Sequence, residues 1–577
     1  MPPVSTSPHT PINLLHRVTH VASRTWQAPR SPQFVVLVLS LWLLTVGNAA
    51  LWLEIARLPH AVTLVPESIT LGLLVFGLTA ALLSLTAWTR FMKPVWIAIL
   101  VIAGVAQHYM LVYGIMIDAT MIGNTAQTDL REARDIVSWA LLGNVLLAAA
   151  LPVLWVARVP LVGGGAWRQL VRSTLLFLLA LLITAGTAAA GYRLLAPFLR
   201  NNTQLRYMLN PLSTVAAAAV YNLKPLFKRA KGLVPVSADA ALGASYATQQ
   251  RRPLMLLVIG ETARGDHFGL NGYERNTTPE LATRDVVSFR NVRSCGTNTL
   301  ASVPCMFSPL GKVAFEKRKM DHENLLDVLQ AAGLAVLWLD NQAGCKGVCA
   351  RIPSAQASNG LPDAMGRHLC VDGECLDQAM LYGLDARIAA LDPQRSRKGV
   401  VVVMHQMGSH GPAYFKRSSL SSKKFKPECA TSAISECPLP EVVNAYDNSI
   451  VETDLFLARA IDWLKSEERH FDTSLLYMSD HGESLGEYGL FLHGLPYALA
   501  PDAQKHVAFV GWFGNETLRR SNVDRKCLAG ARDAVLTHDN LYHSVLGLLD
   551  VHSSSYQPSL DVSSACRSGA ILRRQDG

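Results

Sequence analysis

The sequence predicts two parts: an α-helical membrane domain with five spans, followed by an α/β domain built on a largely parallel sheet with helices on both faces. Three observations predict this fold class. Half of the 577 residues are hydrophobic and only 17% are charged, which excludes a disordered chain and a nucleic-acid-binding array. Only six of the 44 acidic residues lie in the first 200 positions. From about residue 250, short apolar runs alternate with helical stretches.

Five apolar stretches are long enough to cross a membrane, because a span takes about 20 residues. The first lies too deep in the chain and lacks a small-residue cleavage site, so we interpret it as a span and not as a signal peptide. The predicted spans are approximately 34–53, 69–88, 95–114, 137–156 and 175–194.

The basic residues predict the orientation of these spans. With the N-terminus inside, the inner segments hold eight lysines and arginines and the outer loops hold three, as the positive-inside rule requires. We therefore expect a multi-pass protein of a bacterial inner membrane whose C-terminal domain lies in the periplasm. The expected division is a cytoplasmic segment over 1–33, a transmembrane domain over 34–198, an interfacial linker over 199–240 and a catalytic domain over 241–577. For 199–240, which mixes apolar and basic residues, an ordinary linker helix is an equal alternative to a segment lying on the membrane.

All ten cysteines lie in the C-terminal part, mostly in close pairs. An even set confined to that part predicts disulfides formed in an oxidising compartment, with reduced thiols as the alternative. Zinc-ribbon ligation is a weaker reading, because only Cys345 and Cys349 approach its short spacing. The close pairs are Cys295 with Cys305, Cys345 with Cys349, Cys370 with Cys375, and Cys429 with Cys437, which leaves the pairing of Cys527 and Cys566 open.

The α/β pattern is predicted from apolar runs rich in β-forming residues, which alternate with helical stretches. The expected strands begin at LMLLVIG (254), LAVLWLD (334), VVVVMH (400), SLLYMSD (474) and HVAFVGWF (506). The expected helices cover 324–332, 378–391 and 442–465.

Polar residues follow four of these runs, where ligands bind in open α/β sheets. Carboxylates and imidazoles together suit a divalent metal; mixed nitrogen and oxygen ligands favour zinc, with manganese as the main competitor. For any one residue alone, a loop-exposed polar side chain is the alternative. The residues are Glu261, Asn341, Gln342, Lys346, His405, His410, Asp480, His481 and Glu483.

The segment SCGTNTLASVPCMFS offers hydroxyl groups that such a metal could activate. Thr297, Thr299 and Ser302 lie in a loop between Cys295 and Cys305, with a helix expected to start at the threonine. A hydroxyl there would lose its proton readily on a metal and would face a helix N-terminus suited to phosphate. A simple N-cap role is the alternative for a lone threonine.

The segments GETARGDHFGLNGYERNTTP, SCGTNTLASVPCMFS, GSHGP and SDHGESLGE, after five spans, closely resemble the lipid A phosphoethanolamine transferases, the family that includes the mobile colistin-resistance enzymes. The resemblance covers nearly the whole chain. It implies an alkaline phosphatase/sulfatase fold for the C-terminal domain. It also implies Thr299 as the nucleophile and one zinc ion held by Glu261, Asp480 and His481 together with Thr299, with a second ion during turnover left open.

The resemblance also implies substrate-binding residues. His410 and His493 would serve the phosphate group or a second zinc, and Lys346 would contact substrate; Gln342 and His405 are placed with them. Asn124, Thr128 and Glu132 stand four residues apart in the loop between the third and fourth spans, so one helical face could present them to a lipid headgroup. The alternative is the solvated face of a short amphipathic helix.

The reaction so implied is a ping-pong transfer. Thr299 would take phosphoethanolamine from phosphatidylethanolamine and pass it to a phosphate of lipid A. The added amine would lower the negative charge of the outer surface and so weaken binding of polymyxins and other cationic peptides. We expect a membrane-embedded monomer that binds no nucleic acid.

Four other functions are alternatives to a lipid A phosphoethanolamine transferase, and the sequence supports them to different degrees. A transferase acting on core sugars of lipopolysaccharide or on periplasmic glucans would share the same motifs. A phosphoglycerol transferase of the lipoteichoic-acid type is disfavoured by the paired cysteines. A sulfatase needs a cysteine or serine followed by x-Pro-x-Arg for conversion to formylglycine. After Ser302, Met306 stands at the position of that arginine, so a sulfatase is rejected. A non-enzymatic membrane sensor predicts lost metal ligands, whereas every expected ligand is present.

Overall fold

The computed structural model describes residues 28–59, 61–128, 130–162, 164–227, 232–371 and 373–567, with side chains for all of these except 130–132 and 224–227. The chain divides into two compact units. The first, here the helical unit, comprises Met1–Val112 and Trp139–Ala216. The second, here the α/β unit, comprises Tyr113–Ser138 and Ala217–Gly577. The segment between the third and fourth spans therefore belongs to the α/β unit.

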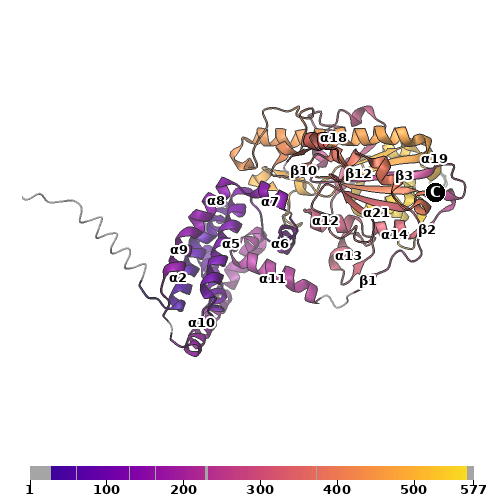
Figure 1. Ribbon diagram of the computed structural model, residues 1–577. Coiled ribbons are helices and arrows are strands. Elements are labelled where there is room, and N and C mark those ends of the chain that lie inside the picture. The colour runs from indigo at the N-terminus through magenta and orange to yellow at the C-terminus, as the bar shows by residue number, and fades with distance from the viewer. Residues whose placement is uncertain are drawn as a thin grey trace, which may run out of the picture. The chain divides into compact units, whose positions relative to one another are not determined.

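The helical unit confirms the prediction of five spans, coloured indigo to magenta in Figure 1. Apolar side chains such as Leu39, Trp96 and Val156 fill its interior, and α4 (Val65–Ser84) packs along α10. Among the described residues, the five helices long and apolar enough to cross a membrane are Pro32–Arg57, Ala61–Ser84, Met92–Tyr113 (α5), Trp139–Arg158 and Ala166–Asn201 (α10).

The first span contains a short irregularity that polar side chains satisfy. Helices α2 (Pro32–Thr45) and α3 (Ala49–Arg57) are separated by a 3₁₀ turn at Val46–Asn48. The buried Asn48 amide donates to the Leu43 carbonyl at 2.7 Å, and the Gln107 side-chain oxygen accepts from the backbone N–H of residue 49 at 3.1 Å. Inside a membrane such groups must find partners within the protein, because no water is present to replace them.

The centre of the α/β unit is a seven-stranded sheet in the order β4-β15-β12-β3-β11-β7-β8. The five predicted strands are all present, and strands β12, β3, β11, β7 and β8 run parallel. The run at 506 forms β15, which pairs antiparallel with β12 and with β4 at the sheet edge. The strands are β3 (Arg252–Gly260), β4 (Val286–Phe289), β7 (Ala335–Asp340), β8 (Ser354–Gln356), β11 (Val400–His405), β12 (Phe471–Ser479) and β15 (Phe509–Phe513).

Helices cover both faces of this sheet, as predicted. The long helix α18 (Leu439–Ser466) lies over one face, while α12 (Thr299–Met306), α14 (Leu325–Ala331) and α21 (Asp539–Leu548) lie over the other (Figure 1). Alternate strand residues such as Met255 and Leu257 pack against this second group of helices in one buried core, as the two-residue period of a strand requires.

One predicted helix is wrong as a continuous element. The stretch 378–391 forms a 3₁₀ turn at Asp377–Leu381 and a separate short helix α16 (Leu384–Ala389). Gly383 breaks it, because its φ of +63° lies in the left-handed region and cannot continue an α-helix. The predicted helices at 324–332 and 442–465 correspond to α14 and α18.

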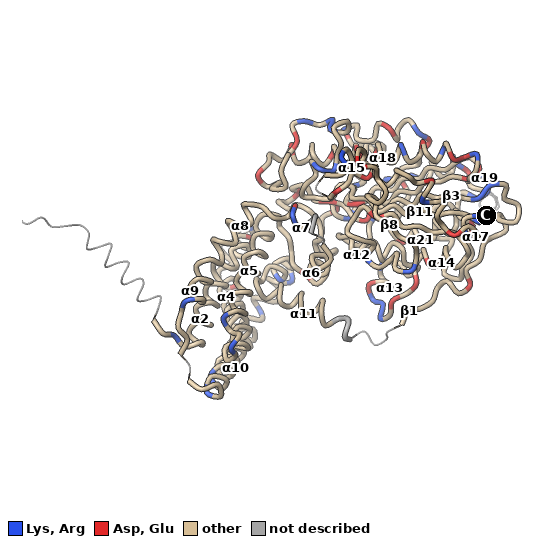
Figure 2. The backbone as a smooth tube through the Cα atoms, in the orientation of Figure 1, with Lys and Arg blue, Asp and Glu red and all other residues tan. Residues whose placement is uncertain are grey.

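The charged residues and the cysteines are distributed unequally between the two units. Figure 2 shows few coloured residues on the spans and many on the α/β unit, and all ten cysteines are paired there. The four close pairs are confirmed, and Cys527 joins Cys566. Disulfides at this density are typical of an oxidising compartment.

Candidate active site

The polar residues predicted at strand ends meet because the strands that carry them are adjacent and in register. Opposite Gly260, the last residue of β3, stands Ser479, the last of β12. His405 ends β11 opposite Ile259 on one side and Asp340 on the other. The residues that come next in each strand therefore converge at one edge of the sheet.

Glu261, Asp480 and His481 form the centre of the site. All three side chains are fully buried, and the His481 Nε2 atom lies 3.2 Å from Glu261 Oε1 and 3.3 Å from Asp480 Oδ2. One ligand atom from each residue lies within 4.8 Å of the others. Two carboxylates and an imidazole at this spacing form a candidate metal centre.

The hydrogen bonds leave one atom of each of these side chains for a cation. His481 Nδ1 faces the Gly482 carbonyl at 2.9 Å, and Asp480 Oδ1 accepts from the backbone N–H groups of Thr262 and His481. The remaining atoms, Glu261 Oε1, Asp480 Oδ2 and His481 Nε2, are buried without a hydrogen-bond partner. Buried polar atoms are rarely left so, and these three fit a bound divalent cation.

The electrostatics lead to the same conclusion. Burial and the Glu261 charge raise the pKa of the Asp480 carboxyl. Burial alone would raise the pKa of Glu261, but the positive charge of His481 and the nearby histidines outweighs it, so the pKa of Glu261 is lowered. Burial alone would lower the pKa of His481, but the carboxylates of Asp480 and Glu261 outweigh it, so the pKa of His481 is raised. The candidate metal centre thus holds two buried carboxyl groups whose negative charges require positive charge nearby, which a bound metal ion would supply.

Thr299 contacts this centre. Its Oγ1 atom donates to Glu261 Oε2 at 3.1 Å, and the Gln342 amide donates to the same oxygen at 2.8 Å. As predicted, α12 begins at Thr299; Asn298 is the N-cap, and its side chain accepts from the backbone N–H of Ala301 at 2.9 Å. The hydroxyl therefore lies at a helix N-terminus, where backbone N–H groups favour an anionic phosphate.

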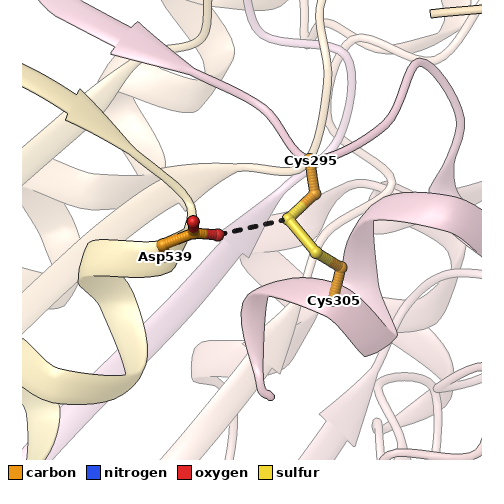
Figure 3. Close-up of side chains that lie close together, drawn as sticks. All are labelled: Cys295, Cys305 and Asp539. Atoms are coloured by element: carbon orange, nitrogen blue, oxygen red, sulfur yellow. Dashed lines mark hydrogen bonds between the residues drawn. A yellow bond between two sulfur atoms is a disulfide. The ribbon is translucent and has the colours of Figure 1, made fainter. Parts of the chain in front are cut away.

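Figure 3 shows the disulfide between Cys295 and Cys305. It closes the loop that carries Thr299. It joins the chain after β5 (Asn291–Arg293) to the last turn of α12. Asp539, the first residue of α21, lies with Oδ1 3.8 Å from Cys295 Sγ. Because both sulfurs are bonded to each other in the disulfide, Cys295, Cys305 and Asp539 do not form a metal site.

We expect the double substitution Cys295→Ser with Cys305→Ser to lower the free energy of unfolding by about 3 kcal/mol, because the short closed loop regains its freedom in the unfolded chain. Turnover should fall as well, since α12 loses its anchor beside Thr299. Thermal unfolding of the purified protein, followed by an activity assay of the folded fraction, checks both. The matched control is Cys429→Ser with Cys437→Ser, which should cost stability without the loss of turnover.

Two further histidines line the site. The His493 ring lies 4.4 Å from the His481 ring and 5.4 Å from the His410 ring, centroid to centroid. The loop that carries His493 is held to the threonine loop, since the Gly494 N–H donates to the Thr297 carbonyl at 2.7 Å. Burial lowers the pKa of the half-buried His410 to about 3, so its imidazole is neutral at physiological pH.

The remaining predicted residues lie as follows. His405 is fully buried with Nδ1 3.0 Å from Asp340 Oδ1, and its Nε2 has no hydrogen-bond partner. Lys346 has φ +50° and its Nζ donates to the Ala343 carbonyl of its own loop at 3.0 Å.

The single helical face predicted for Asn124, Thr128 and Glu132 is not formed. Helix α6 (Ala119–Ala126) ends in a turn in which the Gln127 N–H donates to the Asn124 carbonyl, and α7 (Leu130–Ile136) begins separately. Thr128 lies between the helices with Oγ1 3.0 Å from the Asn124 carbonyl, and the side chain of Glu132 lies outside the described residues.

Helix α6 nevertheless lies directly beside α12, which begins at Thr299. A Cβ atom added at Gly123 would stand 2.8 Å from Leu300 Cδ2, and one added at Gly494 would stand 2.5 Å from Met121 Cε. Leu300 directly follows Thr299. The segment between the third and fourth spans thus forms part of the surroundings of the site within the α/β unit.

Three residues orient the histidines, a role that the sequence does not predict for any of them; of the three, it indicates only Glu483, as a strand-end residue of the candidate metal site. Glu483 Oε2 lies 2.7 Å from His493 Nδ1, and Tyr414 donates its hydroxyl to Glu483 Oε1 at 2.5 Å. Asp340 orients His405. Asp340 ends β7 and Glu483 comes shortly after β12, so their positions near strand ends could have indicated a role in the site. Tyr414 does not directly follow a strand, so its sequence position gave no such indication.

A largely parallel sheet whose strand ends carry two acids and a histidine, beside a threonine at a helix N-terminus, fits a sulfatase-like domain. A family model described as Sulfatase matches residues 253–551, and one described as Phosphoethanolamine transferase EptA/EptB matches residues 75–225.

Individual relatives narrow the class further. Phosphoethanolamine transferase EptA of Escherichia coli (strain K12) is 36% identical over 506 residues, 86% of this chain and 90% of that protein. Phosphatidylethanolamine transferase Mcr-1 of Escherichia coli is 35% identical over 537 residues, 90% of this chain and 95% of that one. The integral membrane protein lipooligosaccharide phosphoethanolamine transferase A of Neisseria meningitidis superposes with a TM-score of 0.85 at 31% identity, covering 92% of this chain and 98% of that chain. This chain belongs to the family of EptA and Mcr phosphoethanolamine transferases.

Proposed function

We propose that this chain transfers phosphoethanolamine from phosphatidylethanolamine to a phosphate group of lipid A, through a covalent intermediate on Thr299. The observation that carries the proposal is the Thr299 hydroxyl, 3.1 Å from Glu261 at the N-terminus of α12 and beside three unpartnered ligand atoms. Relatives support the substrates: one is named a phosphatidylethanolamine transferase, and the Neisseria structure is named for lipooligosaccharide.

Zinc is the ion that we propose for the site. Glu261, Asp480 and His481, with the Thr299 oxygen, would hold it, because two carboxylates, one imidazole and a hydroxyl match the donor set that zinc accepts. When bound, zinc lowers the pKa of a coordinated hydroxyl and neutralises charge on the transferring group.

In the first half-reaction, Thr299 Oγ attacks the phosphorus of the donor lipid. The new bond joins Thr299 Oγ to phosphorus, the Thr299 proton passes along its hydrogen bond to Glu261 Oε2, and the bond from phosphorus to the glycerol oxygen breaks. That oxygen takes up a proton and leaves as diacylglycerol, with His493, which Glu483 orients, as the proposed proton source; the neutral His410 would instead contact the phosphate oxygens. The first backbone N–H groups of α12 face the developing charge on the phosphoryl oxygens.

In the second half-reaction, a phosphate oxygen of lipid A attacks the same phosphorus and its proton passes to His493. The bond from phosphorus to the Thr299 oxygen breaks, and that oxygen regains its proton from Glu261. Glu483 and Asp340 keep His493 and His405 in fixed orientations through both steps. Lys346, Gln342, Asn124, Thr128 and Glu132 are the proposed contacts to the lipid substrates.

The product explains the proposed biological role. Each transfer adds a primary amine to a phosphate and lowers the negative charge of the outer surface, so polymyxins and cationic peptides bind less strongly. We propose the bacterial inner membrane as the location, with residues 1–33 cytoplasmic, spans over 34–198, a linker over 199–240 and a periplasmic catalytic domain over 241–577, acting as a monomer.

Mass spectrometry of lipid A tests this function. In a Gram-negative host, the wild-type chain should yield a lipid A species heavier by one phosphoethanolamine, and Thr299→Ala should not. Unmodified lipid A in both strains, with both proteins present in the membrane, would contradict lipid A phosphate as the acceptor.

A sugar of the lipopolysaccharide core is the second candidate acceptor. The observation that favours it is a relative named Kdo(2)-lipid A phosphoethanolamine 7''-transferase, which is 28% identical over 309 residues, 51% of this chain. Mass spectrometry of the core oligosaccharide from the same strains would then show the added group.

A further inference from the structure

A buried arginine links the segment between the third and fourth spans to the histidines of the site. Arg417 is 5% exposed and uses three nitrogens. Its Nε donates to the His410 carbonyl at 3.1 Å, Nη1 to Glu374 Oε2 at 2.7 Å, and Nη2 to Asp135 Oδ2 at 3.0 Å. A planar guanidinium reaches three partners through three separate nitrogens in a rigid fork, whereas a lysine has a single nitrogen.

Asp135 is the partner that comes from the other end of the chain. It lies in α7, is also 5% exposed, and is 282 positions from Arg417. Its second oxygen accepts from Lys416. Two buried acids, Asp135 and Glu374, thus face the buried Arg417 and the exposed Lys416, and the cluster is balanced in charge.

The short stretch 410–417 reaches both histidines. At its start stands His410, whose carbonyl binds Arg417. In its middle, Tyr414 donates to Glu483, which in turn faces His493 Nδ1. A shift of this stretch would therefore move His410 directly and would withdraw the hydrogen bond that orients the Glu483–His493 pair.

We propose that Asp135 and Arg417 are positioning residues, whose ion pair uses the segment between the third and fourth spans to hold the stretch 410–417, and with it His410 and His493, in place for phosphoryl transfer. The catalytic part rests on the proposed function. Removing the Asp135 charge leaves two bases, Lys416 and Arg417, facing a single acid, Glu374. Both bases lie within three positions of Tyr414.

The first test is kinetic and uses the full-length protein in phosphatidylethanolamine-containing nanodiscs. Asp135→Asn, which keeps size but removes charge, should lower kcat for diacylglycerol release about tenfold to a hundredfold and leave KM within about twofold. Asp135→Glu, which keeps the charge, should recover most of the turnover. The control Asp462→Asn breaks an exposed ion pair with Arg284 and should leave kcat unchanged.

The second test needs no activity. Hydrogen exchange of peptides covering 410–417 should be faster in Asp135→Asn than in the wild type and unchanged in Asp462→Asn, while bound zinc and the melting temperature of the α/β unit stay close to wild type. If the wild type releases no diacylglycerol, the proposed function fails, and exchange alone still decides whether Asp135 holds this stretch.

Three results would overturn the proposal: unchanged exchange over 410–417 in Asp135→Asn, an unchanged kcat, or a loss confined to KM. A variant that fails to fold would be replaced by Arg417→Lys, which keeps the charge but has one nitrogen in place of the three that bind the His410 carbonyl, Glu374 and Asp135. That variant should show the same faster exchange and the same fall in kcat, and wild-type behaviour would equally overturn the proposal.

Discussion

Replacing Thr299 by alanine is expected to lower the rate of diacylglycerol release from phosphatidylethanolamine by at least about a thousandfold. The substitution removes the hydroxyl that we propose as the nucleophile, Thr299 Oγ1, which lies at the start of α12 and 3.1 Å from Glu261 Oε2. The measurement is a single-turnover assay with a labelled donor lipid and no acceptor, which isolates the first half-reaction.

Thr299→Ser provides the matched comparison. Serine keeps the hydroxyl and loses one methyl group, so it should retain measurable release, well above that of the alanine variant. Both variants should keep the fold, because the Asn298 cap and the Cys295–Cys305 disulfide remain. Release by Thr299→Ala at a rate near that of the wild type would exclude Thr299 as the nucleophile.

The second large effect is expected from Glu261→Gln. The amide keeps the shape of the side chain but removes the charge that faces His481, and its nitrogen cannot ligate a cation through a lone pair. We expect the purified variant to lose most of its zinc and its turnover to fall at least about a hundredfold, the upper end of the cost seen for residues that only support a ligand.

Elemental analysis of the purified proteins separates metal loss from chemistry. Glu261→Gln should lack zinc, whereas Thr299→Ala should keep most of it, since three of the four proposed ligands remain. Dialysis of the wild type against a chelator should reproduce the Glu261→Gln phenotype, and added zinc should reverse it. Full zinc content together with full activity in Glu261→Gln would rule out the proposed ligand set.

Much of the central sheet could be predicted because its strands are short apolar runs whose ends carry the polar residues. In a parallel sheet those ends share one edge, so Glu261 and Asp480 could be placed together without knowledge of the structure. The close cysteine pairs were equally readable, because sequence neighbours had few other partners within reach. Cys527 and Cys566, 39 positions apart, had no such local signal.

The parts that escaped prediction depend on contacts between distant positions or on single backbone conformations. Arg417 contacts Asp135, 282 positions away, and Tyr414 contacts Glu483, 69 positions away. No periodic pattern in the sequence predicts either contact. The stretch 378–391 has helical composition but breaks at Gly383. The expected face of Asn124, Thr128 and Glu132 assumed a continuous helix, whereas a turn at Gln127 ends α6.

The central claim is that phosphoethanolamine passes through Thr299. The most direct measurement is peptide mass spectrometry of the full-length protein after incubation with phosphatidylethanolamine in the absence of acceptor. The account predicts that the peptide containing Thr299 becomes heavier by one phosphoethanolamine, with fragment ions that place the group on that residue, and that adding lipid A removes it. Diacylglycerol release with the Thr299 peptide unmodified throughout, or modification at another residue, would contradict the account.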